Sequence, residues 1–190
     1  MSTASQVSAT LFVPQSLESA PEKSRPVLQN VKKAFGFIPN LMATFANNPA
    51  VLEGYLALDS VFEKGSFAPA ERQLILLAAS VENDCNYCTA AHSTIAKGFL
   101  HVAPEIVSAI RSNAPVADNK INALVNLTRE IVRERGFAKQ TTVNAFLDAG
   151  YRKEQVMELL LGVALKTISN YLDHISPTPL DPAFEAEKVR

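Results

Sequence analysis

The stretch that decides the fold runs from residue 69 to residue 92 and reads PAERQLILLAASVENDCNYCTAAH. Its first part, residues 69–82, opens with a proline, which suits the first turn of a helix. An uninterrupted apolar run, Leu74 to Ala79, follows. A helix that is apolar on every side is buried in the centre of a protein. The sequence therefore predicts a central buried helix over residues 69–82 and a second helix that starts near Cys85.

The rest of the chain also follows helical patterns, because apolar residues recur at spacings of three and four and because proline and glycine fall at the joints. No Asn-Gly or Asp-Gly pair marks a hairpin. Five glycines directly follow a helical pattern, where a left-handed cap is common: Gly36, Gly65, Gly98, Gly136 and Gly150. The expected helices cover residues 22–35, 39–47, 49–64, 69–82, 85–97, 103–112, 117–135, 139–149 and 152–174. The predicted fold class is an all-α, multi-helix bundle.

Three segments are expected along the chain. Residues 1–20 are rich in Ser, Thr and Ala with little apolar pattern, which predicts a flexible N-terminal arm. Residues 21–175 hold the helical patterns and form the helical domain. Residues 176–190 contain three prolines, so this stretch is expected to be an extended C-terminal tail.

Charge and hydropathy argue against several classes of function. With 18 Lys and Arg against 19 Asp and Glu, the net charge is −1, so no basic field exists that would attract nucleic acid. The N-terminus lacks the positive start and apolar stretch of a secretory signal, and the longest apolar run is too short to cross a membrane. We therefore expect a cytoplasmic protein with no membrane partner. In the reducing cytosol a close cysteine pair is more often catalytic or metal-binding than a structural disulfide.

The two cysteines of the chain, Cys85 and Cys88, stand three residues apart, and His92 follows four residues after the second. Residues at these spacings are neighbours on one face of a helix, so the three side chains are expected in one stripe. Asn83 and Asp84 are candidate N-caps, which places Cys85 at the helix start, where the dipole favours a thiolate. The histidine can accept the thiol proton or, as a cation, stabilise the thiolate. A sulfenic acid on one sulfur can be captured by the other as a disulfide.

Two other chemistries are weighed against a redox pair. A zinc site could use Cys85, Cys88 and His92, but the chain has no further cysteine, and metal-binding pairs usually come from separate elements. Covalent haem attachment requires a histidine directly after the second cysteine, where Thr89 stands. The third alternative is that the cysteines act as small hydrophobic core residues. The pattern favours a redox dithiol that uses no metal and no cofactor.

Residues 80–92, which include Cys-Asn-Tyr-Cys-Thr-Ala-Ala-His, resemble the core of the AhpD-like alkylhydroperoxidase family within the carboxymuconolactone decarboxylase superfamily. The resemblance extends over residues 71–75 and reappears at residues 170–174 and 178–181, so it spans most of residues 25–182. It implies an all-α AhpD-like fold and assembly into a homo-oligomer, a trimer or hexamer. It also implies that the substrate is a small hydroperoxide and that an external thiol or dithiol re-reduces the cysteines.

The resemblance further implies roles for three residues. Cys88, the second cysteine, is the thiol that attacks the peroxide, Cys85 is its disulfide partner, and His92 belongs to the proton relay. The spacing independently favours Cys88 as the attacking thiol, because only Cys88 lies one helical turn from the histidine.

Two departures from the family pattern leave the relay incomplete. Founding members have a glutamate twelve residues before the first cysteine, where this chain has Gln73, and a histidine between the cysteines, where it has Tyr87. Glu82 and Glu71 are candidate substitutes for the missing glutamate. Glu71 lies about 200° round a helix from the expected position, so Glu82 is preferred as the fourth catalytic residue.

Three functions remain open on the sequence. The first is a thiol-dependent peroxidase or disulfide reductase, which the cysteine pair favours. The second is a decarboxylase, as in the founding members of the superfamily, that does not use the cysteines, and the third is a non-enzymatic helical oligomer. Two further side chains are expected in the core: Tyr87 as a packing residue and His174 as a hydrogen-bonded histidine on the last helix.

Overall fold

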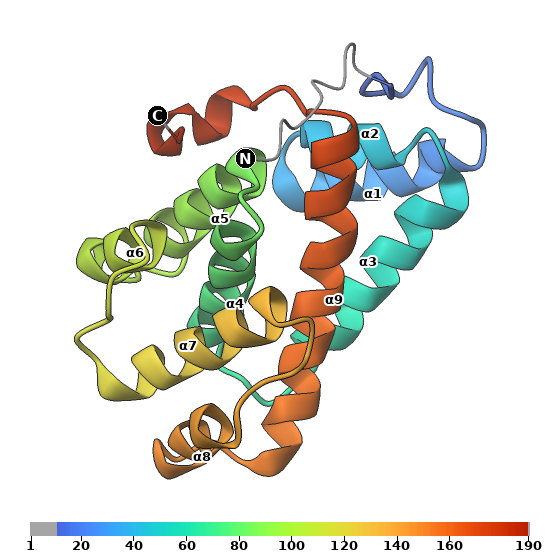
Figure 1. Cartoon of the computed structure of the whole chain (residues 1–190). Coiled ribbons are helices and arrows are strands. Elements are labelled where there is room, and N and C mark those ends of the chain that lie inside the picture. Colours follow the sequence, from blue (N-terminus) through green and yellow to red (C-terminus); the bar gives the residue numbers. More distant parts are fainter. Residues whose placement is uncertain (1–10, 190) are drawn as a thin grey trace, which may run out of the picture.

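The computed structural model describes residues 11–189, and in this range the regular secondary structure is helical (Figure 1). The elements are α1 (Ser24–Phe35), α2 (Asn40–Phe45), α3 (Pro49–Glu63), α4 (Pro69–Glu82), α5 (Asn86–Gly98), α6 (Pro104–Arg111), α7 (Asn119–Arg133), α8 (Gln140–Asp148), α9 (Lys153–Ile175) and a final 3-10 helix, η1 (Pro182–Glu187). The all-α prediction is confirmed, and each expected helix appears with its ends within two residues of the predicted ends.

Helix α4 forms the centre of the bundle, as its sequence predicts. Residues 73–80 are all buried, and α4 packs against α5, α6, α7 and α9 (Figure 1). The helix begins at Pro69. Proline has no backbone N–H, and at the first position of a helix an N–H would have no partner within the helix. Glu71 caps the first turn, because its carboxylate accepts a hydrogen bond from the backbone N–H of Ala68 at 2.9 Å. The apolar faces of α4 are therefore covered by other helices.

The long helix α9 runs beside α3 and α4 (Figure 1). The contact is closest at Gly162, where an added Cβ would lie 2.9 Å from both Ile75 of α4 and Phe62 of α3. Carbon atoms pack at about 3.5–4.0 Å, so only glycine fits this approach without displacing a neighbour. One turn later the same face of α9 carries Lys166, which is 1% exposed and faces the interior.

The C-terminal segment folds back over α5. Helix η1 packs against α5 (Figure 1). Phe184 of η1 is buried, and its ring centroid lies 6.0 Å from that of Tyr87. The Glu187 carboxylate pairs with Arg111 of α6 at 3.2 Å. The expected extended tail is thus corrected for residues 182–187, because burial of an aromatic side chain and an ion pair hold this stretch as a helical turn against the domain.

Residues 11–20 lie against the domain without forming a helix. The backbone N–H of Phe12 donates to Ser176 Oγ at 2.9 Å, and that of Gln15 donates to the carbonyl of Ala43 at 3.0 Å. The first half of the expected N-terminal arm, residues 1–10, lies outside the described residues. None of the helices between residues 11 and 189 has the length and apolar character needed to span a membrane.

Candidate active site

The entry into α5 positions both cysteines. Asp84 adopts a left-handed φ of 55°, a conformation that Asp tolerates better than most residues. Cys85 is the N-cap, since its Sγ accepts a hydrogen bond from the backbone N–H of Cys88 at 3.4 Å. This corrects the expectation that Asn83 or Asp84 caps the helix. Cys88 lies in the first turn of α5, where the helix dipole favours a negatively charged sulfur.

Cys88 is the thiol that the site ionises. The hydrogen bond from the Cys85 thiol lowers its pKa most, and the Lys166 ammonium and Ser169 hydroxyl, whose Oγ lies 3.9 Å from the sulfur, act in the same direction. Together they outweigh the opposing effect of burial and lower the pKa of Cys88 to about 6. At neutral pH Cys88 is therefore mostly thiolate, which is the nucleophilic form.

Cys85 remains a protonated thiol. The hydrogen bond that it donates to Cys88 and its burial both raise its pKa, and the negative charges of Cys88 and Asp173 add to the effect. Asp173 Oδ2 lies 3.5 Å from the Cys85 sulfur, and Thr178 N–H donates to the other carboxylate oxygen at 2.9 Å. The two sulfurs therefore differ in charge, which suits one to attack an oxidant and the other to resolve the product.

His92 follows Cys88 by one turn of α5, as expected, but its ring nitrogens contact other residues. Nδ1 lies 2.5 Å from the Gln73 amide, and Nε2 lies 2.8 Å from Lys166 Nζ. Burial and the Lys166 charge both lower the pKa of His92, so the ring is neutral. If Nε2 of the neutral ring accepts a hydrogen bond from Lys166, the ring hydrogen is on Nδ1. That Nδ1–H then donates to the side-chain oxygen of Gln73, with the amide oriented so that its oxygen faces the ring. The structure thus supports Lys166, rather than His92, as the cation of the site.

Lys166 is the site residue that the sequence pattern did not reveal. Its side chain is almost completely buried on α9, although lysine is among the residues least often found inside proteins. A signal for it was present, because Lys166 follows the buried Leu159 by seven residues and so continues the inward stripe of α9.

A pocket of about 300 Å³ opens beside Cys88. Cys88, His92, Gln73 and Lys166 line it, whereas Cys85 does not. Much of the remaining wall is apolar and is formed by Leu41, Met42, Leu56, Phe62, Leu76, Ile95, Leu165 and Phe184. Cys88 thus lines the pocket with very little surface, because only 1% of that residue is exposed.

The geometry gives no support to a zinc site. Within residues 11–189 no group of three or more His, Cys, Asp or Glu side chains is arranged to hold a metal ion. Both nitrogens of His92 are engaged, one by Gln73 and one by Lys166. A cation at this place would also meet the buried Lys166 ammonium, which repels it.

Residues 49–130 match the model of the Carboxymuconolactone decarboxylase family. This segment runs from α3 into α7 and contains both cysteines and His92. The match agrees with the resemblance of residues 80–92 to AhpD-like members of the carboxymuconolactone decarboxylase superfamily. No curated protein matches the sequence.

Solved structures show that the whole described chain has the AhpD-like fold. The AhpD core of an uncharacterized peroxidase-related protein from Ralstonia eutropha JMP134 is 21% identical, with a TM-score of 0.81 over 92% of this chain and 94% of that chain. A peroxidase-related protein from Silicibacter sp. TM1040 is 14% identical, with a TM-score of 0.78 over 96% and 99%. The debrominase Bmp8 is 19% identical, with a TM-score of 0.78 over 94% and 96%. At these identities the similarity shows the fold, and the AhpD-like prediction is confirmed.

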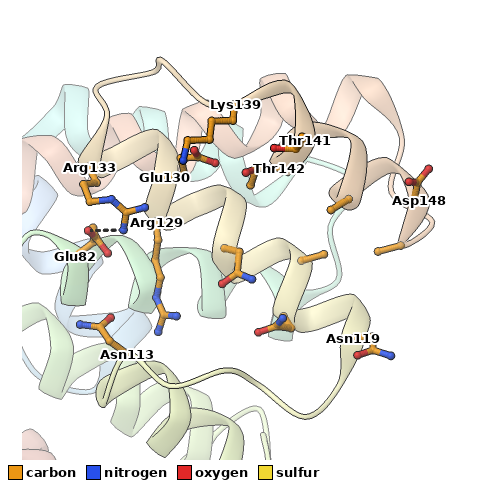
Figure 2. A pocket seen from close by; sticks show the side chains of 15 residues that line it. Glu82, Asn113, Asn119, Arg129, Glu130, Arg133, Lys139, Thr141, Thr142 and Asp148 are labelled. Atoms are coloured by element: carbon orange, nitrogen blue, oxygen red, sulfur yellow. Dashed lines mark hydrogen bonds and ion pairs between the residues drawn. The ribbon is translucent and has the colours of Figure 1, made fainter.

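The Glu82 carboxylate lies away from this AhpD-like site. Glu82 and Gln73 are nine residues apart on α4, which places them on opposite faces of the helix. Its carboxylate pairs with Arg133 at 3.3 Å and lines a separate polar groove of about 1050 Å³ beside α7 and α8 (Figure 2). Glu71 is also engaged elsewhere, because it accepts a hydrogen bond from the Tyr151 hydroxyl at 2.9 Å. The expected carboxylate substitute is therefore corrected: Gln73 itself contacts His92.

Tyr87 and His174 behave differently from each other. Tyr87 is buried, as expected, and its hydroxyl also donates to Asp181 at 2.6 Å and accepts from the backbone N–H of Leu41 at 3.3 Å. His174 is exposed at the end of α9, where its ring stacks on Tyr171. The expectation of a core histidine is thus corrected, because His174 lies on the outward side of the last turn of α9, whereas Asp173 in the same turn faces Cys85.

We expect the Tyr87→Phe variant to be less stable by about 1–3 kcal/mol, because the change leaves the buried backbone N–H of Leu41 without its partner and removes one of the hydrogen bonds to the Asp181 carboxylate. Urea unfolding at equilibrium measures the loss. The matched control is Tyr171→Phe on α9, where the phenol is half exposed and the stability should stay within about 0.5 kcal/mol of the parent. Equal stability of the two variants would show that the Tyr87 hydroxyl does not tie the C-terminal segment to α5.

Proposed function

We propose that the protein is a thiol-dependent enzyme that reduces hydroperoxides, with Cys88 as the attacking thiolate and Cys85 as the thiol that completes a disulfide. One observation carries the proposal: Cys88, whose pKa is lowered, lines the pocket, while Cys85, whose thiol stays protonated, caps the same helix and does not line the pocket. The shared fold with peroxidase-related proteins supports it. The apolar wall of the pocket favours an organic hydroperoxide over hydrogen peroxide.

The reaction follows from the charges of the two sulfurs. The Cys88 thiolate attacks the terminal oxygen of R–O–OH, the O–O bond breaks, and the alkoxide takes up a proton to become the alcohol, which leaves a sulfenic acid on Cys88. The Cys85 thiol attacks that sulfur, a disulfide forms and water leaves. An external thiol or dithiol then reduces the disulfide and restores both cysteines.

The test is mass spectrometry of the native protein before and after one equivalent of cumene hydroperoxide. We expect the loss of two hydrogens, which peptide mapping places in a Cys85–Cys88 disulfide. In the Cys85→Ser variant the resolving thiol is absent, so a sulfenic acid on Cys88 should accumulate and react with dimedone. Unconsumed hydroperoxide and an unchanged mass in the parent would contradict the proposal.

The rate of hydroperoxide reduction should increase as the pH increases. Because the thiolate is the reactive form and the pKa of Cys88 is about 6, kcat/KM should rise as the pH increases through 6 and level off above about 7. An unperturbed thiol would give a rise near 8.5 instead. Initial rates between pH 4.5 and 9, measured with a saturating external dithiol, distinguish the two profiles.

A second candidate uses the same sulfur on a different substrate. The debrominase Bmp8 shares this fold, and a cysteine-to-alanine variant of it was solved in complex with 2,3,4-tribromopyrrole. The pocket beside Cys88 has the volume and the apolar wall to hold a small aromatic ring. Reductive dehalogenation by Cys88 would release bromide from a brominated pyrrole in the presence of a thiol. Bromide release without hydroperoxide consumption would favour this candidate.

A further inference from the structure

We propose that Lys166 is a further catalytic residue, whose ammonium group is the counter-ion of the Cys88 thiolate and the acid that protonates the leaving alkoxide. The first role concerns the resting site alone, and the second rests on the proposed reduction of hydroperoxides. Lys166 would then supply the proton that Gln73, an amide, cannot supply.

A buried ammonium group requires a negative partner, because a charge inside a protein is stable only when it is paired. Lys166 takes part in none of the ion pairs between carboxylates and cations within residues 11–189. The neutral ring of His92 accepts one of its hydrogens at 2.8 Å but brings no charge. The negative charge that Lys166 needs must therefore come from another group in the pocket.

The ionisable groups around Lys166 come from three helices. They are Tyr55, Asp59 and Glu63 of α3, Arg72 of α4, and Cys85, Tyr87, Cys88 and His92 in α5 and at its N-cap. Burial raises the pKa of Tyr55, so its phenol stays neutral. Burial together with Glu63 raises the pKa of Asp59 to about 6, so this carboxyl is ionised at neutral pH as Cys88 is. It forms no ion pair with Lys166, however, and it is not among the groups that raise the pKa of Lys166 most. Cys88 lines the same pocket and is the group whose ionisation the Lys166 charge favours.

His92 and Gln73 hold the ammonium group in place. His92 Nε2 accepts one hydrogen of Lys166 Nζ, and the Gln73 amide fixes the other side of the ring at Nδ1. An ammonium group has three hydrogens, and after His92 and the Tyr55 hydroxyl one remains for the pocket, which Cys88 lines and where a hydroperoxide would bind. His92 is thus a positioning residue for Lys166.

The first step balances with Lys166 as the proton donor. The Cys88 sulfur forms a bond to the terminal oxygen of R–O–OH, the O–O bond breaks, and its electron pair stays on the RO oxygen. Lys166 transfers a proton to that oxygen, which gives the alcohol, a sulfenic acid on Cys88 and a neutral amine on Lys166. Because the thiolate that raised the pKa of Lys166 is then gone, burial lowers that pKa and stabilises the neutral amine.

The remaining steps return the proton. The Cys85 thiol displaces the hydroxyl of the sulfenic acid, so its hydrogen and that hydroxyl leave as water and a disulfide forms. An external dithiol reduces this disulfide to two thiols and is itself oxidised to a disulfide. The Cys88 thiol then passes its proton to the Lys166 amine, which restores the ion pair. Each cycle moves one proton from Cys88 through Lys166 to the alcohol.

Two variants of the full-length protein separate the two roles. Lys166→Met removes the charge and fills the buried site with a side chain of similar length. Lys166→Arg keeps the charge but does not release a proton at ordinary pH. The readouts are the pH profile of iodoacetamide alkylation at Cys88, followed by peptide mass spectrometry, and the rate of cumene hydroperoxide reduction. Alkylation needs the thiolate but no proton donor. Lys153→Met, at an exposed position of α9, is the matched control.

In Lys166→Met we expect alkylation at pH 7 to slow by about tenfold and to recover at pH 10, because the pKa of Cys88 rises without the Lys166 charge while the hydrogen bond from Cys85 still lowers it. In Lys166→Arg alkylation at pH 7 should stay near that of the parent, while hydroperoxide reduction falls by about a hundredfold. An unshifted alkylation profile in Lys166→Met overturns the counter-ion role, and a parental peroxide rate in Lys166→Arg overturns the acid role. If alkylation differs between the parent and Lys166→Met as expected but the parent consumes no hydroperoxide, the proposed function is refuted and the counter-ion role is still supported.

Discussion

Replacing Cys88 by serine is expected to lower the rate of hydroperoxide reduction by at least about a thousandfold. The serine hydroxyl nearly matches the thiol in size, so the bundle should keep its structure, but it does not ionise near neutral pH. The buried Lys166 would then face a neutral group and could no longer activate a nucleophile. Consumption of cumene hydroperoxide in the presence of dithiothreitol, followed by a peroxide-specific dye, measures the effect.

The Cys85→Ser variant is the matched control, because it changes the same kind of residue three positions away and outside the pocket wall. It should perform one rapid turnover and then stop at the sulfenic acid when only a weak reductant is present. If Cys88→Ser consumed hydroperoxide as fast as the parent, the thiol mechanism would be wrong. Full activity of the Cys85→Ser/Cys88→Ser double variant on a lactone acid would favour the cysteine-independent decarboxylase instead.

The fold could be predicted from the sequence because each helix carries its own signals. Prolines at Pro49, Pro69 and Pro104 open helices, and the apolar run of α4 marks the centre of the bundle. The glycine signal was less uniform: Gly36, Gly136 and Gly150 have left-handed φ angles, whereas Gly65 and Gly98 do not. Helix η1 also opens with a proline, Pro182, but its sequence does not predict the contacts with α5 that hold it, since α5 lies far away along the chain.

The candidate site was predictable only where it is local. Cys85, Cys88 and His92 lie within eight consecutive residues, so helical spacing alone places them near one another. The partners of His92 come from α4 and α9, and no spacing rule connects Gln73 or Lys166 to it in advance. The preference for Glu82 failed for the same reason, since closeness in sequence to the cysteines does not decide which face of α4 a side chain occupies.

The Lys166 ammonium, which favours the ionisation of Cys88, lies on α9. Its position therefore depends on how closely α9 approaches α3 and α4. We expect Gly162→Val to destabilise the protein by at least about 3 kcal/mol, because the new side chain would overlap Ile75 and Phe62, both fully buried. Urea unfolding at equilibrium measures the loss. The matched control is Gly54→Val in α3, where an added Cβ meets no atom within 4 Å, so stability should change by less than about 1 kcal/mol.

The same substitution should also change the chemistry of the pocket. Gly162 and Lys166 are four residues apart on one face of α9, so a helix pushed outward at Gly162 carries the Lys166 ammonium away from His92 and Cys88. Phe62, which lines the pocket, would be displaced as well. In the fraction of Gly162→Val that stays folded, the pKa of Cys88 should therefore rise, and iodoacetamide alkylation at pH 7 should slow relative to Gly54→Val. Lost stability with an unchanged alkylation profile would mean that the approach of α9 does not determine the position of Lys166.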